Sequence, residues 1–318
     1  MIEEPFNTKE NLESNNIIYK NETKSTMCWK MIIVLTVLIG LMTGLGIFVI
    51  FKSIEDFDEK KTDISCIYKI TGNDRIIGEE DIYKIQLLND NFQKDGSISI
   101  YINEKQIEFN TWYKFNKIDN YNIKYLINKE YIYMKNMFKD VTNLVSVEIS
   151  SNYGKFNSSL SSAFLGCKNL KSFRSNINGM ENMDISYMFS NCISLSSVIF
   201  ENFATTVEDS NHMFDNCKSL TSIELNSINT TNDKNMSYMF SNCTSIKQLN
   251  INNYDIRTVK DLSYMFYNCY SLENLIKNDI LFQPDIDTNA SITDMFYNCS
   301  RNVTPIWYHN MTNNSKIL

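Results

Sequence analysis

Residues 261–275, DLSYMFYNCYSLENL, decide the fold because they are one copy of a repeated unit. A close copy, NMSYMFSNCTSIKQL, begins at Asn235, and both copies place a cysteine three positions after a Met-Phe pair. Seven such units follow one another, with their anchors at Phe138, Phe164, Phe189, Phe214, Phe240, Phe266 and Phe296. Repetition on this scale has to be interpreted before any single residue within it.

Each unit contains two local patterns. Before the Phe, apolar residues recur at spacings of three and four, as in Leu262, Met265 and Phe266, which predicts a short helical turn. After the Phe, apolar residues alternate, as at Leu249 and Ile251, which predicts a strand with one buried face. A unit of about 25 residues cannot enclose its own apolar face, so the units must stack into a solenoid, and this period is the length class of leucine-rich repeats.

The run from residue 249 to residue 275, LNINNYDIRTVKDLSYMFYNCYSLENL, resembles the repeat of BspA-like leucine-rich repeat surface proteins. The resemblance rests on the Asn-aromatic-Asp lead, the Met-Phe pair and the Asn-Cys-x-Ser-Leu end, and it covers about residues 134–306. Residues 210–212, Ser175 and Asn302 depart from the pattern. The resemblance implies a surface-displayed recognition module.

Composition divides the chain into six segments. We expect a cytosolic tail at 1–30, a transmembrane helix at 31–51, a linker at 52–62, a small β domain at 63–130, the solenoid at 131–308 and a C-terminal tail at 309–318. The β domain is predicted from alternating apolar residues in SISIYINEKQIEF, which begins at Ser97, and in YNIKYLIN, which begins at Tyr121. The expected fold class is therefore mixed α/β, a leucine-rich-repeat solenoid of about seven coils preceded by one transmembrane helix and a small antiparallel β domain.

The predicted membrane span is MIIVLTVLIGLMTGLGIFVIF, an uncharged run between Lys30 and Lys52. Its length suffices to cross a hydrocarbon core of ~30 Å, and the polar residues before it fit a signal anchor better than a cleaved signal peptide. Lysines are balanced on the two flanks, and only the acidic residues after the span favour a cytosolic N-terminus and an extracellular C-terminal region. Gly40 and Gly44 have the spacing of a helix-helix contact, and the alternative is that they are fillers.

Six of the eight cysteines occupy one position of the unit, namely Cys167, Cys192, Cys217, Cys243, Cys269 and Cys299. Zinc binding is disfavoured because these thiols lie one coil apart and the chain has only two histidines. The favoured interpretation is a small buried side chain at a tight corner, and disulfides between neighbouring coils are the alternative.

The sequence contains none of the patterns that mark common enzymes: no P-loop, no G-x-S-x-G and no H-E-x-x-H. We therefore expect no catalytic residues, no cofactor and no metal site. The net charge of −7 also disfavours nucleic acid as a partner.

The expected ligand-binding face follows from the strand alternation, because residues between the buried positions point outward. Its candidate residues are Arg174, Asn176, Ile199, Glu201, Glu224, Asn226, Gln248, Asn250 and Asn252. A merely solvated face is an equally good interpretation of this polar strip. The preferred function is recognition or adhesion at the cell surface through a protein or glycan ligand, and the alternative is an intracellular or organellar membrane-bound scaffold whose solenoid faces the cytosol.

Overall fold

The computed structural model of the chain describes residues 61–79, 81–92, 96–151, 154–203, 205–225, 228–284 and 289–314. All of them belong to one compact unit, Lys60–Leu318. The predicted tail at 1–30 and the predicted membrane span at 31–51, with Gly40 and Gly44, lie outside the described residues. Within the described residues, no helix has both the length and the apolar character needed to cross a membrane.

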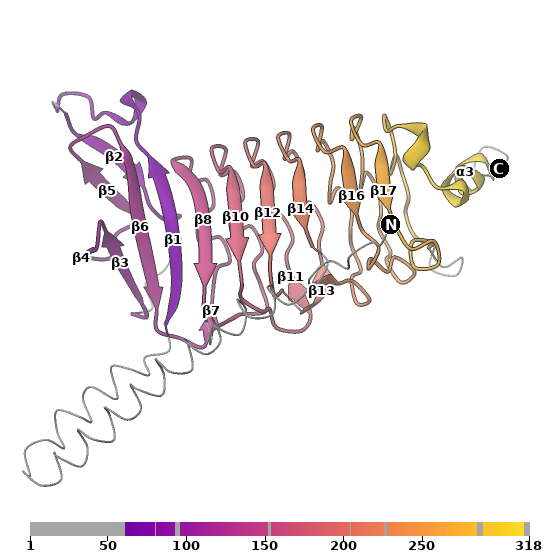
Figure 1. Cartoon of the computed structure of the whole chain (residues 1–318), viewed down its shortest axis with the longest axis horizontal. Coiled ribbons are helices and arrows are strands. Elements are labelled where there is room, and N and C mark those ends of the chain that lie inside the picture. Colours follow the sequence, from indigo (N-terminus) through magenta and orange to yellow (C-terminus); the bar gives the residue numbers. More distant parts are fainter. Residues whose placement is uncertain are drawn as a thin grey trace, which may run out of the picture. The chain divides into compact units, whose positions relative to one another are not determined.

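The first part of the unit is a small set of antiparallel strands with one short 3₁₀ helix. Its elements are β1 (Thr62–Lys69), η1 (Gly72–Asp74), β2 (Tyr83–Gln86), β3 (Ile98–Ile102), β4 (Lys105–Ile107), β5 (Trp112–Phe115) and β6 (Asn120–Ile127). The alternating burial of β1 and β6 agrees with strands that turn one face to the core. These strands stand at the N-terminal end of the stack of coils (Figure 1).

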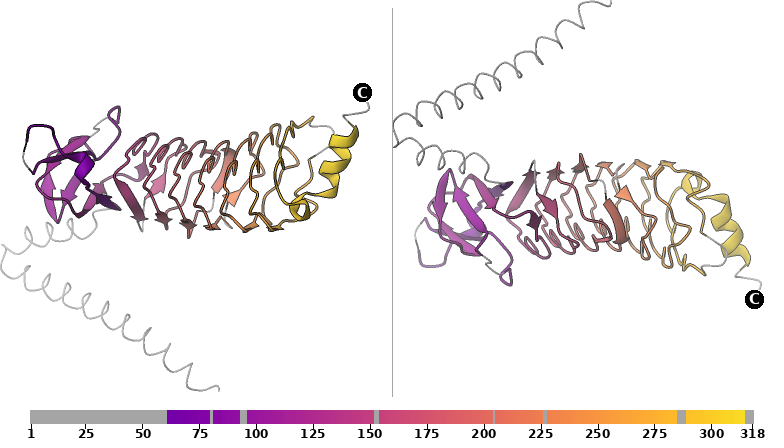
Figure 2. Two further views of the ribbon diagram at one scale, coloured as in Figure 1. Left: turned by 90° about the horizontal axis from the view of Figure 1, so that it is seen from above. Right: turned by 90° about the horizontal axis from the view of Figure 1, so that it is seen from below.

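The second part is a solenoid whose coils stack along one axis (Figures 1 and 2). Its main strands are β8 (Leu144–Ser150), β10 (Ser172–Ser175), β12 (Ser197–Phe200), β14 (Ser222–Glu224), β16 (Gln248–Asn250) and β17 (Asn274–Ile276). Further strands on another side of the coils are β7 (Tyr131–Ile132), β9 (Lys155–Phe156), β11 (Met183–Asp184), β13 (Thr205–Asp209) and β15 (Ile228–Asn229). Neighbouring coils pair in parallel and in register, so Ser172 lies between Ser146 and Ser197 and equivalent positions form columns.

Six coils, rather than the predicted seven, contribute a main strand. The seventh unit, anchored at Phe296, continues into η3 (Arg301–Val303) and α3 (Ile306–Asn314) instead. Asn302 stands there in place of the apolar residue that leads into a strand in the other units. By contrast, Ser175 does not break its strand, because its side chain is fully buried within β10.

The prediction of a mixed α/β fold with a helical turn in each unit is wrong, because the solenoid is built of strands and turns. Each Met-Phe segment has two residues with positive φ, four positions apart, such as Tyr264 and Asn268 at 60° each. The Phe266 N–H donates to the Met295 carbonyl of the next coil at 2.9 Å, whereas an α-helix would direct it four residues back. Among the described residues, α3 is the only α-helix.

The main sheet continues from the solenoid into the N-terminal strands. Its order is β14-β12-β10-β8-β1-β6-β3-β4, with β1 antiparallel to both β8 and β6. Behind this junction, the buried Tyr68 and Tyr125 hydroxyls lie 2.8 Å apart, and each donates to the Leu87 carbonyl. The N-terminal strands therefore close the first coil with main-chain hydrogen bonds as well as with side chains.

The last coil is covered by α3. The Trp307 ring packs against Phe282, and its Nε1 donates to the Phe282 carbonyl at 2.8 Å. Tyr308 packs edge-on against Phe296, the last anchor of the series. Strands thus close the N-terminal end of the solenoid, and aromatic side chains of α3 close its C-terminal end.

The interior consists of columns of like side chains. The seven anchor Phe rings stack in nearly parallel pairs, with centroids 5.1–5.7 Å apart. Each recurring cysteine donates from Sγ to the carbonyl of the anchor Phe in the preceding coil, at 2.9–3.2 Å. The prediction of small buried corner residues is confirmed for these cysteines except Cys299, which is partly exposed, and every described cysteine is a free thiol.

Candidate functional site

The outer face of the main sheet carries three of the nine residues predicted to bind a ligand. Arg174 of β10 lies beside Ile199 of β12, which lies beside Glu224 of β14. Glu148 of β8 continues this row on the other side of Arg174. The row exists because the residues on either side of each member point into the core, as Phe173 and Ser175 do around Arg174.

The remaining predicted residues lie at the ends of strands or on the second parallel pair. Gln248 and Asn250 are exposed on β16, beside Asn274 and Ile276 of β17, and the exposed Asn252 follows them. Asn176 is half-buried and accepts a hydrogen bond from the Ser151 N–H at 3.1 Å. Asn226 lies outside the described residues.

One ion pair joins two predicted residues across neighbouring coils. The Arg174 guanidinium donates from Nε and Nη2 to Glu201 Oε1, at 2.9 and 2.5 Å. Both side chains are well exposed, so the pair stabilises the fold by no more than about 1 kcal/mol. Its main effect is to hold the only arginine of the row in a fixed, partly neutralised position.

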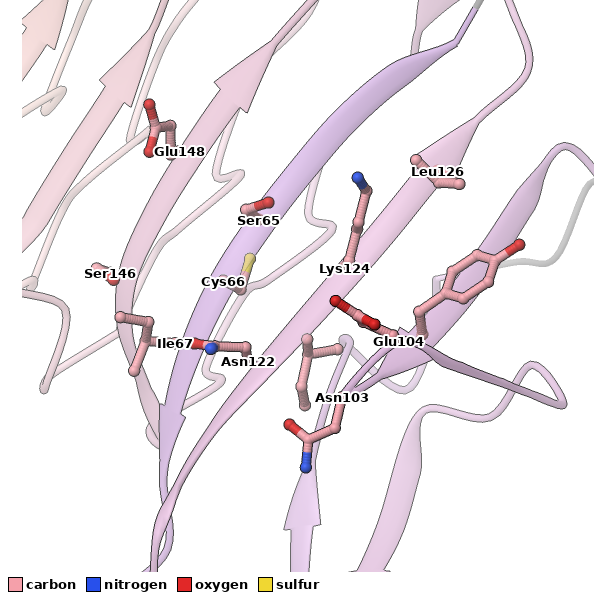
Figure 3. Close-up of a pocket in the computed structure, with 12 residues that line it drawn as sticks. Ser65, Cys66, Ile67, Asn103, Glu104, Asn122, Lys124, Leu126, Ser146 and Glu148 are labelled. Carbon is pink, nitrogen blue, oxygen red and sulfur yellow. The ribbon is translucent and has the colours of Figure 1, made fainter. Parts of the chain in front are cut away.

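A groove of about 880 Å³ lies at the N-terminal end of the same face, over β8, β1, β6 and β3 (Figure 3). Its apolar lining includes Ile67 and Leu126, and Tyr101 of β3 lies beside Lys124 of β6. Its charged lining comes from Glu104, Lys124 and Glu148. Sequence reasoning missed this groove because its walls come from four strands that are distant along the chain.

The charge of the groove is negative. The Lys124 ammonium is paired with Asp63 on the neighbouring strand. Glu104 and Glu148 form no ion pair within the part of the chain that the structure describes. Cys66 also borders the groove, but its side chain is buried, and this burial raises the pKa of the thiol.

A column of stacked rings on the turn side of the coils was also missed. Tyr187, His212, Tyr238 and Tyr264 stand two residues before successive anchor Phe residues, with centroids 4.4–4.6 Å apart and planes within 16°. His212 Nδ1 also lies 3.0 Å from Asp215 Oδ2. His212 breaks the sequence pattern but not the coil, because its planar ring continues the column. The recurring Tyr two places before Phe is the signal that predicts this column.

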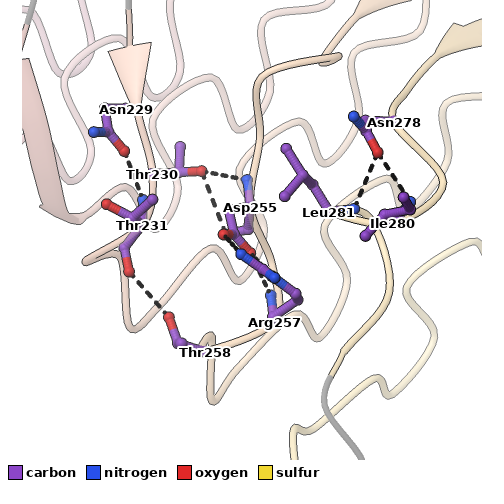
Figure 4. A network of polar contacts seen from close by, with 9 residues as sticks. All are labelled: Asn229, Thr230, Thr231, Asp255, Arg257, Thr258, Asn278, Ile280 and Leu281. Carbon is purple, nitrogen blue, oxygen red and sulfur yellow. Dashed lines mark hydrogen bonds and ion pairs between the residues drawn. The ribbon is translucent and has the colours of Figure 1, made fainter.

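A polar network near β15 explains the aspartate in the Asn-aromatic-Asp lead of the repeat (Figure 4). Asp255 is almost fully buried and accepts hydrogen bonds from the Arg257 N–H, Nε and Nη2, at 2.6–3.0 Å. The Arg257 guanidinium lowers the pKa of the Asp255 carboxyl. Thr230 of the preceding coil accepts from the Asp255 N–H at 2.7 Å. The network therefore stabilises a turn between coils, and it engages the Asp255 carboxylate in hydrogen bonds with Arg257.

Asp233 is a second buried carboxyl between coils. It accepts from the Ser210 hydroxyl at 2.5 Å and from the Asn235 N–H at 3.0 Å. It forms no ion pair with any residue that the structure describes. Burial raises its pKa from 3.8 to about 7. Across the residues that the structure describes, no three His, Cys, Asp or Glu side chains are arranged to hold a metal ion.

The fold and its exposed face define a β-solenoid repeat protein. A family model described as "Mycoplasma protein of unknown function, DUF285" matches residues 132–249 and 183–308, which together span more than half of the chain. The chain belongs to this family. Comparisons with curated proteins and with solved structures give no match. The finer resemblance to BspA-like leucine-rich repeat proteins stays a prediction.

Proposed function

We propose that this chain is a non-enzymatic recognition protein that is displayed at the cell surface and binds a protein or glycan ligand on the outer face of its main sheet. The observation that carries the proposal is the row formed by Glu148, Arg174, Ile199 and Glu224. The buried columns repeat the same residue from coil to coil, whereas this exposed row changes charge and polarity at every step. Variation on a rigid scaffold is what selective recognition requires.

The composition of the row favours modest affinity at each contact. It contains one arginine and no aromatic side chain, and strong hot spots are rich in Trp, Tyr and Arg. Many copies on one surface would compensate through multivalency. Binding is therefore expected to depend on copy number as well as on individual residues.

A matched pair of isoleucines tests the binding face in cells that carry the full chain. Ile199→Arg places a charge in the middle of the row, and we expect it to reduce attachment to the ligand-bearing surface several-fold. Ile193→Arg makes the same change at an isoleucine that is 41% exposed outside the strands, and it should have no effect. Equal attachment by both variants would show that the outer face of the main sheet does not bind the ligand.

Surface display rests on the predicted span at residues 31–51 and on the acidic residues after it. Protease treatment of intact cells with a C-terminal epitope tag on the chain separates display from the alternative of an intracellular scaffold. We expect the tag to be lost while a cytosolic marker survives. If the tag survives while a known surface protein is digested, the scaffold is the better description.

A further inference from the structure

The groove over β8, β1, β6 and β3 has a chemistry that the rest of the outer face lacks. We propose that it binds an extended, basic peptide segment of a partner protein. This inference rests on the proposed function, because it assigns a partner class to one end of the same recognition face. Its support comes from the shape of the groove, from its charge and from the conformation of one glutamate.

The groove offers two separate apolar side chains between acidic sides. Ile67 of β1 is 39% exposed although it lies inside a strand, and Leu126 of β6 is half-buried. Ser65 and Lys124 lie between them on the same face. Tyr101 of β3 adds an aromatic wall. An extended peptide presents side chains alternately to opposite faces, so its apolar residues can meet Ile67 and Leu126. Long basic side chains between them can bend back toward the acidic sides.

The acidic sides select the charge of the partner. Glu104 and Glu148 flank the groove without an ion pair among the described residues, and Asp63 neutralises Lys124. Lysine or arginine side chains of a ligand would supply the missing counter-charges. Figure 3 shows Glu148 and Glu104 on opposite sides of Ser65 and Lys124, so both acids can engage one ligand.

The same charge argues against other occupants. A second copy of the chain carries a net charge of −7 and would be repelled. Nucleic acid and anionic lipid are disfavoured for the same reason. The N-terminal segment of this chain, residues 1–60, contains more acidic than basic residues and offers no excess of positive charge.

Glu104 occupies a position that its side chain does not favour. It follows Asn103 in the two-residue turn between β3 and β4, and the two residues have φ of 48° and 67°. Turns with positive φ at both central residues favour Asn-Gly, because glycine has no Cβ to clash. A carboxylate is therefore held at the rim of the groove where glycine would suit the backbone better.

This conformation gives a test in which stability and binding move in opposite directions. Glu104→Gly should raise the thermal midpoint of the chain and weaken ligand binding. Asp81→Gly is the matched control, because Asp81 is also an exposed acid with positive φ, 53°, but does not line the groove. It should raise the midpoint and leave binding unchanged.

The probe is a fluorescein-labelled peptide of about nine residues that alternates lysine and valine, ~30 Å long when extended. Its affinity for the full chain in detergent micelles is measured by fluorescence anisotropy at two salt concentrations. We expect Kd to rise about five-fold in Glu104→Gly and in Glu148→Gln, and to fall in Lys124→Gln. A peptide with glutamate in place of lysine should not bind.

Three results would overturn the assignment: unchanged Kd in both glutamate variants, equal weakening in Asp81→Gly, or equal binding of the acidic peptide. Sedimentation of the chain alone adds a fourth, because a dimer that Glu104→Gly dissociates would assign the groove to a second copy. Loss of peptide binding with normal cell attachment leaves the proposed function standing.

Discussion

At the scale of single residues, the cysteine of the repeat is a hydrogen-bond donor and a space filler. Its thiol reaches the carbonyl of the anchor Phe one coil earlier, as Cys217 does with Phe189 at 3.1 Å. Burial raises the pKa of the Cys217 thiol, which keeps it protonated and unreactive at neutral pH. The recurring cysteine therefore contributes to stability, and recognition is proposed only for residues that vary between coils.

Asp233 makes stability depend on pH. Its carboxyl has a pKa of about 7 in the folded chain and 3.8 as a free side chain, so the folded chain holds the proton more tightly. Stability from this group is complete below pH 3.8, falls as pH rises toward 7, and is flat above it. We expect Asp233→Asn to raise the free energy of unfolding at pH 8 by about 4 kcal/mol and to change it little at pH 4.

Denaturant unfolding at several pH values measures this slope. Asp215→Asn is the control, because Asp215 is an acid of the same coil region that lies beside a histidine instead of being isolated in the core. An unchanged pH slope in Asp233→Asn would mean that Asp233 is ionised in the folded chain.

At the scale of elements, the structure corrects one reading and explains it. Apolar spacings of three and four, as in Leu262, Met265 and Phe266, occur in a helical turn and also in two consecutive turns that face one core. The consecutive turns differ from a helical turn in the pair of residues with positive φ, Tyr264 and Asn268. A tyrosine in the sequence does not predict that conformation. The strands were predictable because alternation of apolar and polar residues is typical of one structure, a strand with one buried face.

The column of rings on the turn side should contribute measurable stability. His212→Ala removes the ring between Tyr187 and Tyr238, and we expect a loss of about 1–2 kcal/mol in the free energy of unfolding. His212→Phe keeps the stacking and removes only the contact with Asp215, so it should recover most of the loss. Chemical denaturation of the three proteins distinguishes stacking from the histidine–aspartate contact. If the Phe variant is as unstable as the Ala variant, stacking is not the source.

At the scale of the whole molecule, sequence patterns locate strands but do not show which strands pair. The alternation at residues 97–109 and 121–128 predicts the strands of the N-terminal part, yet nothing local indicates that β1 joins β8 and extends the solenoid sheet. The same limit applies to function. The row of outward residues follows from one repeat, whereas the groove needs β1, β3, β6 and β8 together.

The C-terminal cap should protect the coils nearest to it. Trp307→Ala removes the packing on Phe282 and one hydrogen bond, and stability in a solenoid is transmitted mainly between neighbours. We expect amide hydrogen exchange to accelerate at least ten-fold around β17 and to stay unchanged in β8 and β10. Ile306→Ala is the control, because Ile306 is 81% exposed. Uniform acceleration across all strands would show that the solenoid unfolds as a single unit.

The hydrogen bonds between coils run along the stacking axis, as the parallel pairing of β8, β10, β12 and β14 requires. A load applied along this axis would break the hydrogen bonds between one pair of neighbouring coils at a time. Each coil that yields would release about 25 residues, or ~80 Å of contour length. Under tension between its two ends, the solenoid is therefore expected to lengthen in steps and to dissipate the applied force.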